Sequence, residues 1–343
     1  MAKQSDSFAI YRIPEQSQIK FIQGNCLPQM QTVETLCASK HFVFSPFNKN
    51  NFAFAISADF EGTYDGNNNS FPDFCYSSHT HQNHSKDHYL NLVMEAIHQM
   101  KSTPDFHKVV LARTETFPTK ILDPFELFVL LEQNFPAAFV YLVSTPQTGT
   151  WIGATPELLL EATPKRLKTV ALAGTLPNTE GIHWGKKEIE EQHLVEIYIE
   201  AILHKQGFTY FKNGPHTLNS GQIRHLQTEY NIEVPENNYH QKISQLLNEL
   251  NPTSAVGGMS KEKSIQFIQE NEQINRSMYS GFVGLLEPNK QELFVNLRCM
   301  EIQSGSVTLF AGAGITVHSK PESEFIETTR KMNAIQQFLK PMK

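Results

Sequence analysis

Two pairs of glutamates have a spacing that could support chemistry. Glu188 and Glu191 are three residues apart, and Glu324 and Glu327 repeat that spacing near the C-terminus. If both segments are helical, each pair lies on one face of its helix. Two such faces that converge would offer oxygen ligands to a hard cation such as Mg²⁺. The competing interpretation is a solvated helix face, because glutamates are mostly exposed.

Other ionisable groups lie at the edges of apolar segments. Lys108 opens the segment KVVLA, and Glu157 precedes three leucines. Burial at such positions shifts the pKa of an ionisable group, which is typical of functional sites. Arg298 is expected inside one apolar strand, either paired within the protein or aimed as a fork at a ligand carboxylate. Gly312 and Gly314, in AGAGI, would let the backbone approach a ligand, although this is not a dinucleotide fingerprint.

The elements that position these residues follow an antiparallel pattern. Helices are expected over 87–101, 124–134, about 186–205 and 323–339, with another pair around 251–258. Four consecutive strands joined by turns, at 138–145, 150–154, 157–163 and 166–174, predict antiparallel pairing. Three further strands are expected at 281–287, 292–302 and 306–315. This pattern predicts one large α+β domain with antiparallel sheets and helices outside.

The first hundred residues are expected to form a cover. Residues 1–105 would supply a shortened N-terminal part of the domain, with a mobile loop at 65–87, and residues 106–343 would carry the chemistry. The loop region is rich in histidine but lacks the cysteine or carboxylate spacing of a closed zinc site. We therefore interpret its histidines as solvated: His79, His81, His84 and His88.

Composition excludes several classes of protein. The 343 residues have a net charge of −6, with 40% apolar and 19% charged residues, as in a globular protein. The mild net acidity argues against nucleic acid as the main partner, because phosphate binding needs clustered Lys and Arg, and no 18-residue apolar run predicts a membrane helix. The first residues lack a secretion signal, and Cys26, Cys37, Cys75 and Cys299 form no CxxC. A cytoplasmic location is expected.

Eight blocks in order give the chain a specific resemblance. They are KVVLAR (108–113), GATPELLL (153–160), LAGT (172–175), NPTSAVGG (251–258), YSGFVG (279–284), LRCMEI (297–302), AGAGI (311–315) and ExxExxxK (324–331). Together they resemble the chorismate-utilising enzymes, which include anthranilate, aminodeoxychorismate, isochorismate and salicylate synthases. The resemblance covers roughly residues 105–340. It implies an α/β sandwich with two large antiparallel sheets around a buried site, with Mg²⁺ as cofactor and chorismate as substrate.

The resemblance also assigns roles to individual residues. Glu191 and Glu327 would bind Mg²⁺, with Glu188 and Glu324 beside them, and the metal would hold the ring carboxylate of chorismate. Groups near the pyruvyl carboxylate would be Arg298, Lys331, Tyr279 and the backbone N–H groups near Gly312 and Gly314. Gly174 and Thr175 would line the ring.

Two positions favour isochorismate synthase within the family. Lys108 together with Ala173 resembles the isochorismate and salicylate synthases, whereas aminodeoxychorismate synthases commonly carry lysine at the place of Ala173. Lys108 would act as general base on a water that attacks C2, and protonated Glu157 would act as general acid on the departing C4 hydroxyl. The pathway would be menaquinone or siderophore synthesis. Because water is the nucleophile, no glutamine amidotransferase subunit is expected, and a monomer is preferred.

Departures from the family pattern keep two alternatives open. Asn251 stands where relatives usually carry histidine, and it cannot exchange a proton near neutral pH. The usual KDxxEH segment is altered to KEIEEQH, which bears on the assignment of Glu188 and Glu191. One alternative is a salicylate synthase, which adds pyruvate elimination. The other is a chorismate-binding protein that has lost turnover.

Overall fold

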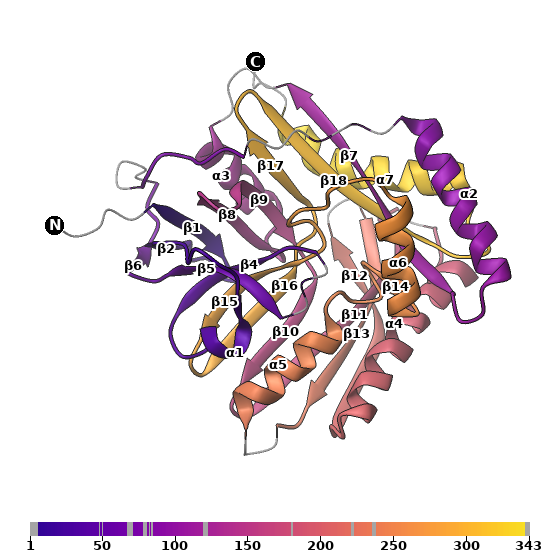
Figure 1. Ribbon diagram of the computed structural model, residues 1–343, viewed down its shortest axis with the longest axis horizontal. Helices are drawn as coiled ribbons and strands as arrows, with labels where there is room; N and C mark the ends of the chain where they lie inside the picture. Colours follow the sequence, from indigo (N-terminus) through magenta and orange to yellow (C-terminus); the bar gives the residue numbers. More distant parts are fainter. Residues whose placement is uncertain are drawn as a thin grey trace.

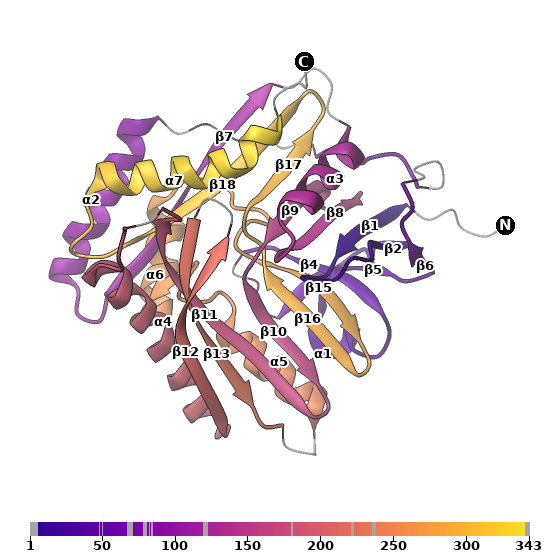
Figure 2. The same cartoon turned by 180° about the vertical axis from the view of Figure 1, so that it is seen from behind.

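In the part of the chain that the structure describes, two antiparallel sheets of nine strands each make up the frame of the molecule (Figures 1 and 2). The computed structural model describes residues 6–47, 49, 51–66, 71–77, 81, 83, 85–118, 123–179, 181–220, 223–234 and 238–339. In spatial order the first sheet contains β14 (Gly258–Met259), β7 (Lys108–Pro118), β18 (Ser306–Ile315), β17 (Cys299–Gln303), β9 (Gly149–Thr155), β8 (Phe139–Thr145), β1 (Ser7–Arg12), β2 (Lys20–Gly24) and β6 (Phe60–Thr63). The second contains β12 (Tyr210–Ser220), β13 (Ile223–Ile232), β11 (Arg166–Pro177), β10 (Leu158–Thr163), β16 (Lys290–Val295), β15 (Phe282–Glu287), β4 (His41–Ser45), β5 (Phe52–Ser57) and β3 (Gln31–Thr32).

Helices cover the outer faces of both sheets. They are α1 (Val33–Leu36), α2 (Lys86–Ser102), α3 (Pro124–Asn134), α4 (Lys186–Lys205), α5 (Tyr239–Leu250), α6 (Lys261–Asn271) and α7 (Pro321–Gln336), followed by a 3₁₀ turn at Gln337–Leu339. The expected helices are all present, and the sandwich of two antiparallel sheets confirms the predicted fold class. No helix in the described part of the chain is long and apolar enough to cross a membrane.

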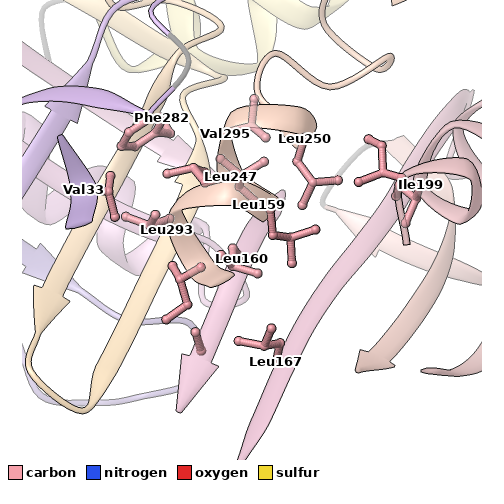
Figure 3. Close-up of a cluster of buried hydrophobic side chains, with 14 of the residues drawn as sticks. Val33, Leu159, Leu160, Leu167, Ile199, Leu247, Leu250, Phe282, Leu293 and Val295 are labelled. Carbon is pink, nitrogen blue, oxygen red and sulfur yellow. The ribbon is translucent and has the colours of Figure 1, made fainter. Parts of the chain in front are cut away.

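Apolar side chains form a core between the sheets and further cores beneath the helices. Between the sheets, Phe139 of β8 stacks on Phe294 of β16 with ring centroids 4.6 Å apart. Outside the second sheet, Leu247 and Leu250 of α5 and Ile199 of α4 belong to one buried cluster with strand leucines (Figure 3). Burial of this many apolar side chains on both faces of a sheet stabilises the sandwich through the hydrophobic effect. Because both faces are buried, the sequence alone does not show where one long apolar strand ends and the next begins.

The chain passes between the sheets several times, and two of these crossings lie next to each other. The first lies between β9 and β10, at Pro156 and Glu157, so the four consecutive strands pair as two hairpins in different sheets instead of one series. The second lies between β16 and β17, at residues 296–298, so the prediction of one strand over 292–302 is wrong. Both halves of that segment are buried, and an apolar run does not reveal such a change of sheet.

Hydrogen bonds tie the two crossings together. The backbone N–H of Val295 donates to the carbonyl of Glu157 at 2.9 Å, and that of Ala154 donates to the carbonyl of Arg298 at 3.1 Å. Arg298 has a φ of 48°, a left-handed conformation that non-glycine residues adopt rarely. We expected Arg298 inside a strand. It lies instead at a turn where the chain leaves one sheet for the other.

The first hundred residues contribute strands to both sheets. β1 pairs with β8 in the first sheet, and β4 pairs with β15 in the second. Within the predicted 65–87 loop, Phe71 and Phe74 pack on Phe8, and His81 is a buried partner of Glu301 at 2.6 Å. His81 is therefore not the solvated residue we expected, whereas His79 and His84 lie outside the described residues. Mobility of the loop stays a prediction.

Candidate active site

A pocket lies where the two crossings meet β11, β18 and helices α4 and α7. Its lining joins residues from segments far apart in the sequence, including Pro156 of the first crossing and Leu297 of the second. Eight predicted site residues line it: Glu157, Gly174, Thr175, Glu191, Tyr279, Arg298, Gly312 and Lys331. Two more, Lys108 and Gly314, contact Glu191 from behind the lining.

Lys108 and Glu191 form a buried ion pair at one side of the pocket. The Lys108 ammonium lies 3.1 Å from Glu191 Oε1, and its side chain is fully buried at the start of β7. A side chain at Gly314 would place its Cβ 2.6 Å from that same oxygen and 2.9 Å from Lys108 Cε. Glycine is thus required at position 314 because the ion pair occupies the space of a side chain.

The two carboxylates in the pocket have opposite protonation preferences. Burial raises the pKa of Glu157 to about 8, although the charges of Lys108 and Lys331 oppose this shift. Burial also acts on Glu191, but there the charges of Lys108 and Lys331 outweigh it and lower the pKa. At neutral pH the pocket therefore contains one protonated carboxyl group and one carboxylate, the combination that acid–base chemistry requires.

Sequence reasoning missed His225, which joins the two sides of the pocket. This buried side chain on β13 contacts Arg298 Nη2 through Nε2 at 3.1 Å and the carbonyl of Gly174 through Nδ1 at 3.0 Å. Burial, followed by the charges of Arg298 and Lys331, lowers the pKa of His225 to about 3. Because Arg298 can only donate, we assign the neutral tautomer in which Nδ1–H donates to Gly174.

The strand paired with His225 is bulged beside the pocket. The register of β11 against β13 shifts between Ala173 and Thr175, and Gly174 has a φ of 65°. Along β13 the even positions from Leu226 to Ile232 are buried, so simple alternation would place His225 on the exposed face. The extra residue of this bulge is Gly174 on β11, and its carbonyl accepts from His225, which holds the imidazole at the pocket. The only sequence signal was Gly174, at which the strand could bulge.

The end of β18 presents backbone groups and a lysine to the pocket. The Lys331 ammonium donates to the carbonyl of Gly312 at 2.9 Å. Strand register pairs Gly312 with Ala112, whose N–H bonds Glu272 on the far side of β7. Gly312 is therefore in a pair without mutual hydrogen bonds, and its N–H points away from β7. Burial lowers the pKa of Arg298 to about 10, so this guanidinium stays charged at neutral pH and adds to the positive end of the pocket.

The predicted metal ligands carry lysine partners. Glu324 is 1% exposed and accepts from the Lys187 ammonium at 2.9 and 3.2 Å, and Glu327 pairs with Lys331 at 2.8 Å. Glu188 instead caps α4, since its Oε2 accepts from the N–H of Gly185 at 3.0 Å. Among the described residues, no three acidic, histidine or cysteine side chains are grouped so as to hold a metal ion.

The donor chemistry nevertheless fits a divalent cation. Glu191, Glu324 and Glu327 offer carboxylate oxygens, which Mg²⁺ prefers, and each now binds a lysine ammonium that stands in for a cation. A metal ion would replace some of these ammonium groups after side-chain rotation. Glu188, by contrast, is already used as a helix cap.

Asn251 lies outside the pocket lining. It is buried at the C-terminal end of α5, and its carbonyl accepts from the Lys261 ammonium at 2.7 Å. Ala255 and Val256 of the same NPTSAVGG block do line the pocket. The contribution of this block to the described pocket wall is therefore apolar.

The chain belongs to the chorismate binding enzyme family, whose model matches residues 55–340. Isochorismate synthase EntC of Escherichia coli (strain K12) is 28% identical over 249 residues, which cover 69% of this chain and 63% of EntC. The vibriobactin-specific isochorismate synthase of Vibrio cholerae is 32% identical over 244 residues, 66% of this chain and 60% of that relative. The aligned region thus spans less than two thirds of each relative.

A solved structure shows the same fold. MenF, the menaquinone-specific isochorismate synthase from Escherichia coli, superposes with a TM-score of 0.83 at 19% identity, covering 99% of this chain and 90% of MenF. Anthranilate synthase component I from Streptococcus pneumoniae superposes with a TM-score of 0.72 at 16% identity, covering 98% and 93%. The predicted family and fold are confirmed.

Proposed function

We propose that this protein is an isochorismate synthase, an isomerase that converts chorismate reversibly to isochorismate with Mg²⁺. The observation that carries the proposal is the buried Glu157, whose pKa burial raises to about 8, in the same pocket as the Lys108–Glu191 pair. Hydroxyl transposition needs an acid for the departing group and a base for the attacking water. The names of the relatives support this reaction class.

The residues of the pocket have different roles in the proposed reaction. Lys108 acts as general base and takes a proton from a water that attacks C2 of the ring, and Glu157 donates its proton to the C4 hydroxyl, which leaves as water. Arg298, Lys331 and the N–H groups at Gly312 and Gly314 bind the pyruvyl carboxylate, beside Tyr279. Gly174 and Thr175 line the ring.

Glu191 and Glu327 would hold Mg²⁺, with Glu324 beside them. When bound, the ion would neutralise the ring carboxylate and compete with Lys108 for Glu191. Removal of divalent cations with EDTA is expected to abolish turnover, and added Mg²⁺ is expected to restore it.

The product made from chorismate tests the proposal. Purified protein with chorismate and Mg²⁺ should yield an equilibrium mixture of chorismate and isochorismate. Liquid chromatography measures the two compounds. Salicylate and pyruvate would instead identify a salicylate synthase, and binding without any product would identify a chorismate-binding protein. Lys108→Ala should reduce turnover by roughly 10²–10⁴-fold, the usual contribution of an acid–base group. Lys101→Ala, at the exposed end of α2, is the matched control.

Pathway and assembly follow from the same chemistry. Relatives named for vibriobactin and for menaquinone support either siderophore or menaquinone synthesis. Water as nucleophile removes the need for an ammonia-supplying amidotransferase subunit, and we propose a monomer. The four free cysteines, three of them buried, favour a reducing compartment such as the cytoplasm.

A further inference from the structure

Lys187 occupies the position between the two carboxylates of α7. It lies in the first turn of α4, and its ammonium is 2.9 Å from Glu324 Oε1 and 4.0 Å from Glu327 Oε2. The Glu324 side chain is only 1% exposed. A carboxylate buried to this extent needs a counter-charge, since its desolvation is otherwise costly.

The place of Lys187 on its helix is electrostatically unfavourable. The N-terminal end of a helix carries partial positive charge, which repels a cation in the first turn. Lys187 nevertheless points at α7, so the carboxylates there are the groups that hold it. Burial, followed by the charge of Glu327, raises the pKa of Glu324, and Lys187 opposes that rise.

Lys187 is also the lysine of this cluster that can leave most easily. Its side chain is 37% exposed, compared with 28% for Lys331 and 0% for Lys108. Lys331 is held further by the carbonyl of Gly312, and Lys108 lies under β18. Lysine is a compact cation on a flexible stem, which can swing into solvent without rearrangement of the backbone.

We propose that Lys187 is an exchangeable counter-ion, which neutralises Glu324 and Glu327 in the cation-free protein and withdraws when a divalent cation binds them. This inference rests on the magnesium site of the proposed function. A divalent cation bound to these carboxylates would repel the Lys187 ammonium that now contacts them, so Lys187 must compete with the metal. Competition would protect the buried carboxylates when metal is scarce, at the expense of metal affinity.

Replacement of Lys187 separates its effect on stability without cation from its effect on Mg²⁺ affinity. Without cation, the Lys187→Met variant should unfold at a lower temperature than the wild type. Titration calorimetry should show that the variant binds Mg²⁺ roughly tenfold more tightly, which is a typical coupling within one ion-pair network. Saturating Mg²⁺ should bring the unfolding temperature back close to that of the wild type. Lys186→Met, the exposed neighbour on α4, should change neither quantity.

A second variant covers the case in which Lys187→Met does not fold. Lys187→Arg keeps the charge and can bind Glu324 through two hydrogen bonds, so it should weaken Mg²⁺ binding and preserve stability without cation. Unchanged or weaker Mg²⁺ binding in Lys187→Met would overturn the exchange alone. No Mg²⁺ binding by the wild-type protein would overturn the exchange together with the magnesium site.

Discussion

Glu157 and Glu191 line the same pocket from different walls, yet their carboxyl groups have opposite pKa shifts. Glu157 lies at the first crossing between the sheets, where burial dominates and raises its pKa to about 8. Glu191 lies on α4, where the ammonium of Lys108 is 3.1 Å away and the net shift is downward. Lys108 and Lys331 act on both groups, but at Glu191 the charge of Lys187 and the direct contact of Lys108 add to them, so the balance between burial and nearby cations decides whether the group is an acid or an anion.

The two walls also differ in how they hold their side chains. The crossing is clamped by backbone bonds such as Val295 N–H to Glu157 O, and the hydroxyl of Thr155 donates to the carbonyl of Val295 at 2.5 Å. The helical wall relies on long side chains, including Lys187 and Lys331, that reach between α4, α7 and β18. The acid thus lies on a wall held by backbone hydrogen bonds, whereas the helical wall, where we propose the exchange of Lys187, is held by long side chains.

Glu157→Gln should produce the largest effect. Because glutamine cannot donate an acidic proton, we expect kcat to fall roughly 10²–10⁴-fold in a chorismate-to-isochorismate assay. The same variant should be more stable than the wild type at pH 7. The folded-state pKa lies above the unfolded value of 4.5, so the wild type loses stability as the pH rises from about 4.5 to about 8.

Thermal unfolding at several pH values checks whether Glu157→Gln is more or less stable than the wild type. The stability advantage of Glu157→Gln should disappear below about pH 4.5, where Glu157 is protonated in both states. A variant that is less stable than the wild type at pH 7 would show that Glu157 is ionised in the folded protein. Glu161→Gln, on the adjacent strand β10, is the matched control for a change of charge.

Glu191→Gln should change stability in the opposite direction. It leaves the buried Lys108 ammonium without its carboxylate, and loss of one partner of a buried ion pair costs about 3 kcal/mol. Since the pKa of Glu191 is lowered, the deficit should be present at pH 7 and shrink as the pH falls below about 4.5. Denaturant unfolding measures it. A variant as stable as the wild type, or more stable, would contradict the opposite pKa shifts that we assign to Glu157 and Glu191.

The pH dependence of turnover sharpens the same contrast in the unmodified protein. With the pKa of Glu157 at about 8, the acid is present below that pH and is lost above it. The kcat/KM of the wild type should therefore fall about tenfold for each pH unit well above 8. Residual activity of Glu157→Gln should lack this alkaline decline, and retention of it would assign the decline to another group.

His225→Asn should have the smallest effect. Loss of the bond from Arg298 should loosen the guanidinium, so we expect KM for chorismate to rise about tenfold, the value of a charged hydrogen bond, with little change in kcat. Because His225 is neutral at neutral pH, its replacement should not alter the pH profile between 5 and 8. A shifted profile in that range would contradict the assigned neutral state.

Periodicity and turn residues predicted the elements that repeat locally. Helices α2, α3 and α4 begin and end within about a residue of the expected positions, because capping residues and apolar spacing are local signals. Ordered motifs predicted a set of site residues, and eight of these residues line one pocket. Neither kind of signal predicted Arg298 at a crossing or His225 in the pocket.

The sequence by itself determined which residue types were available: the carboxylates of α4 and α7, Lys108 at a strand start, and the glycines of β18. Only the tertiary structure decided which carboxylate is protonated and which lysine holds each anion. The physical reason is that a pKa depends on burial and on charges brought close by long-range contacts. Glu157 and Glu191 are both glutamates in the sequence; the crossing buries one, and β7 places Lys108 beside the other.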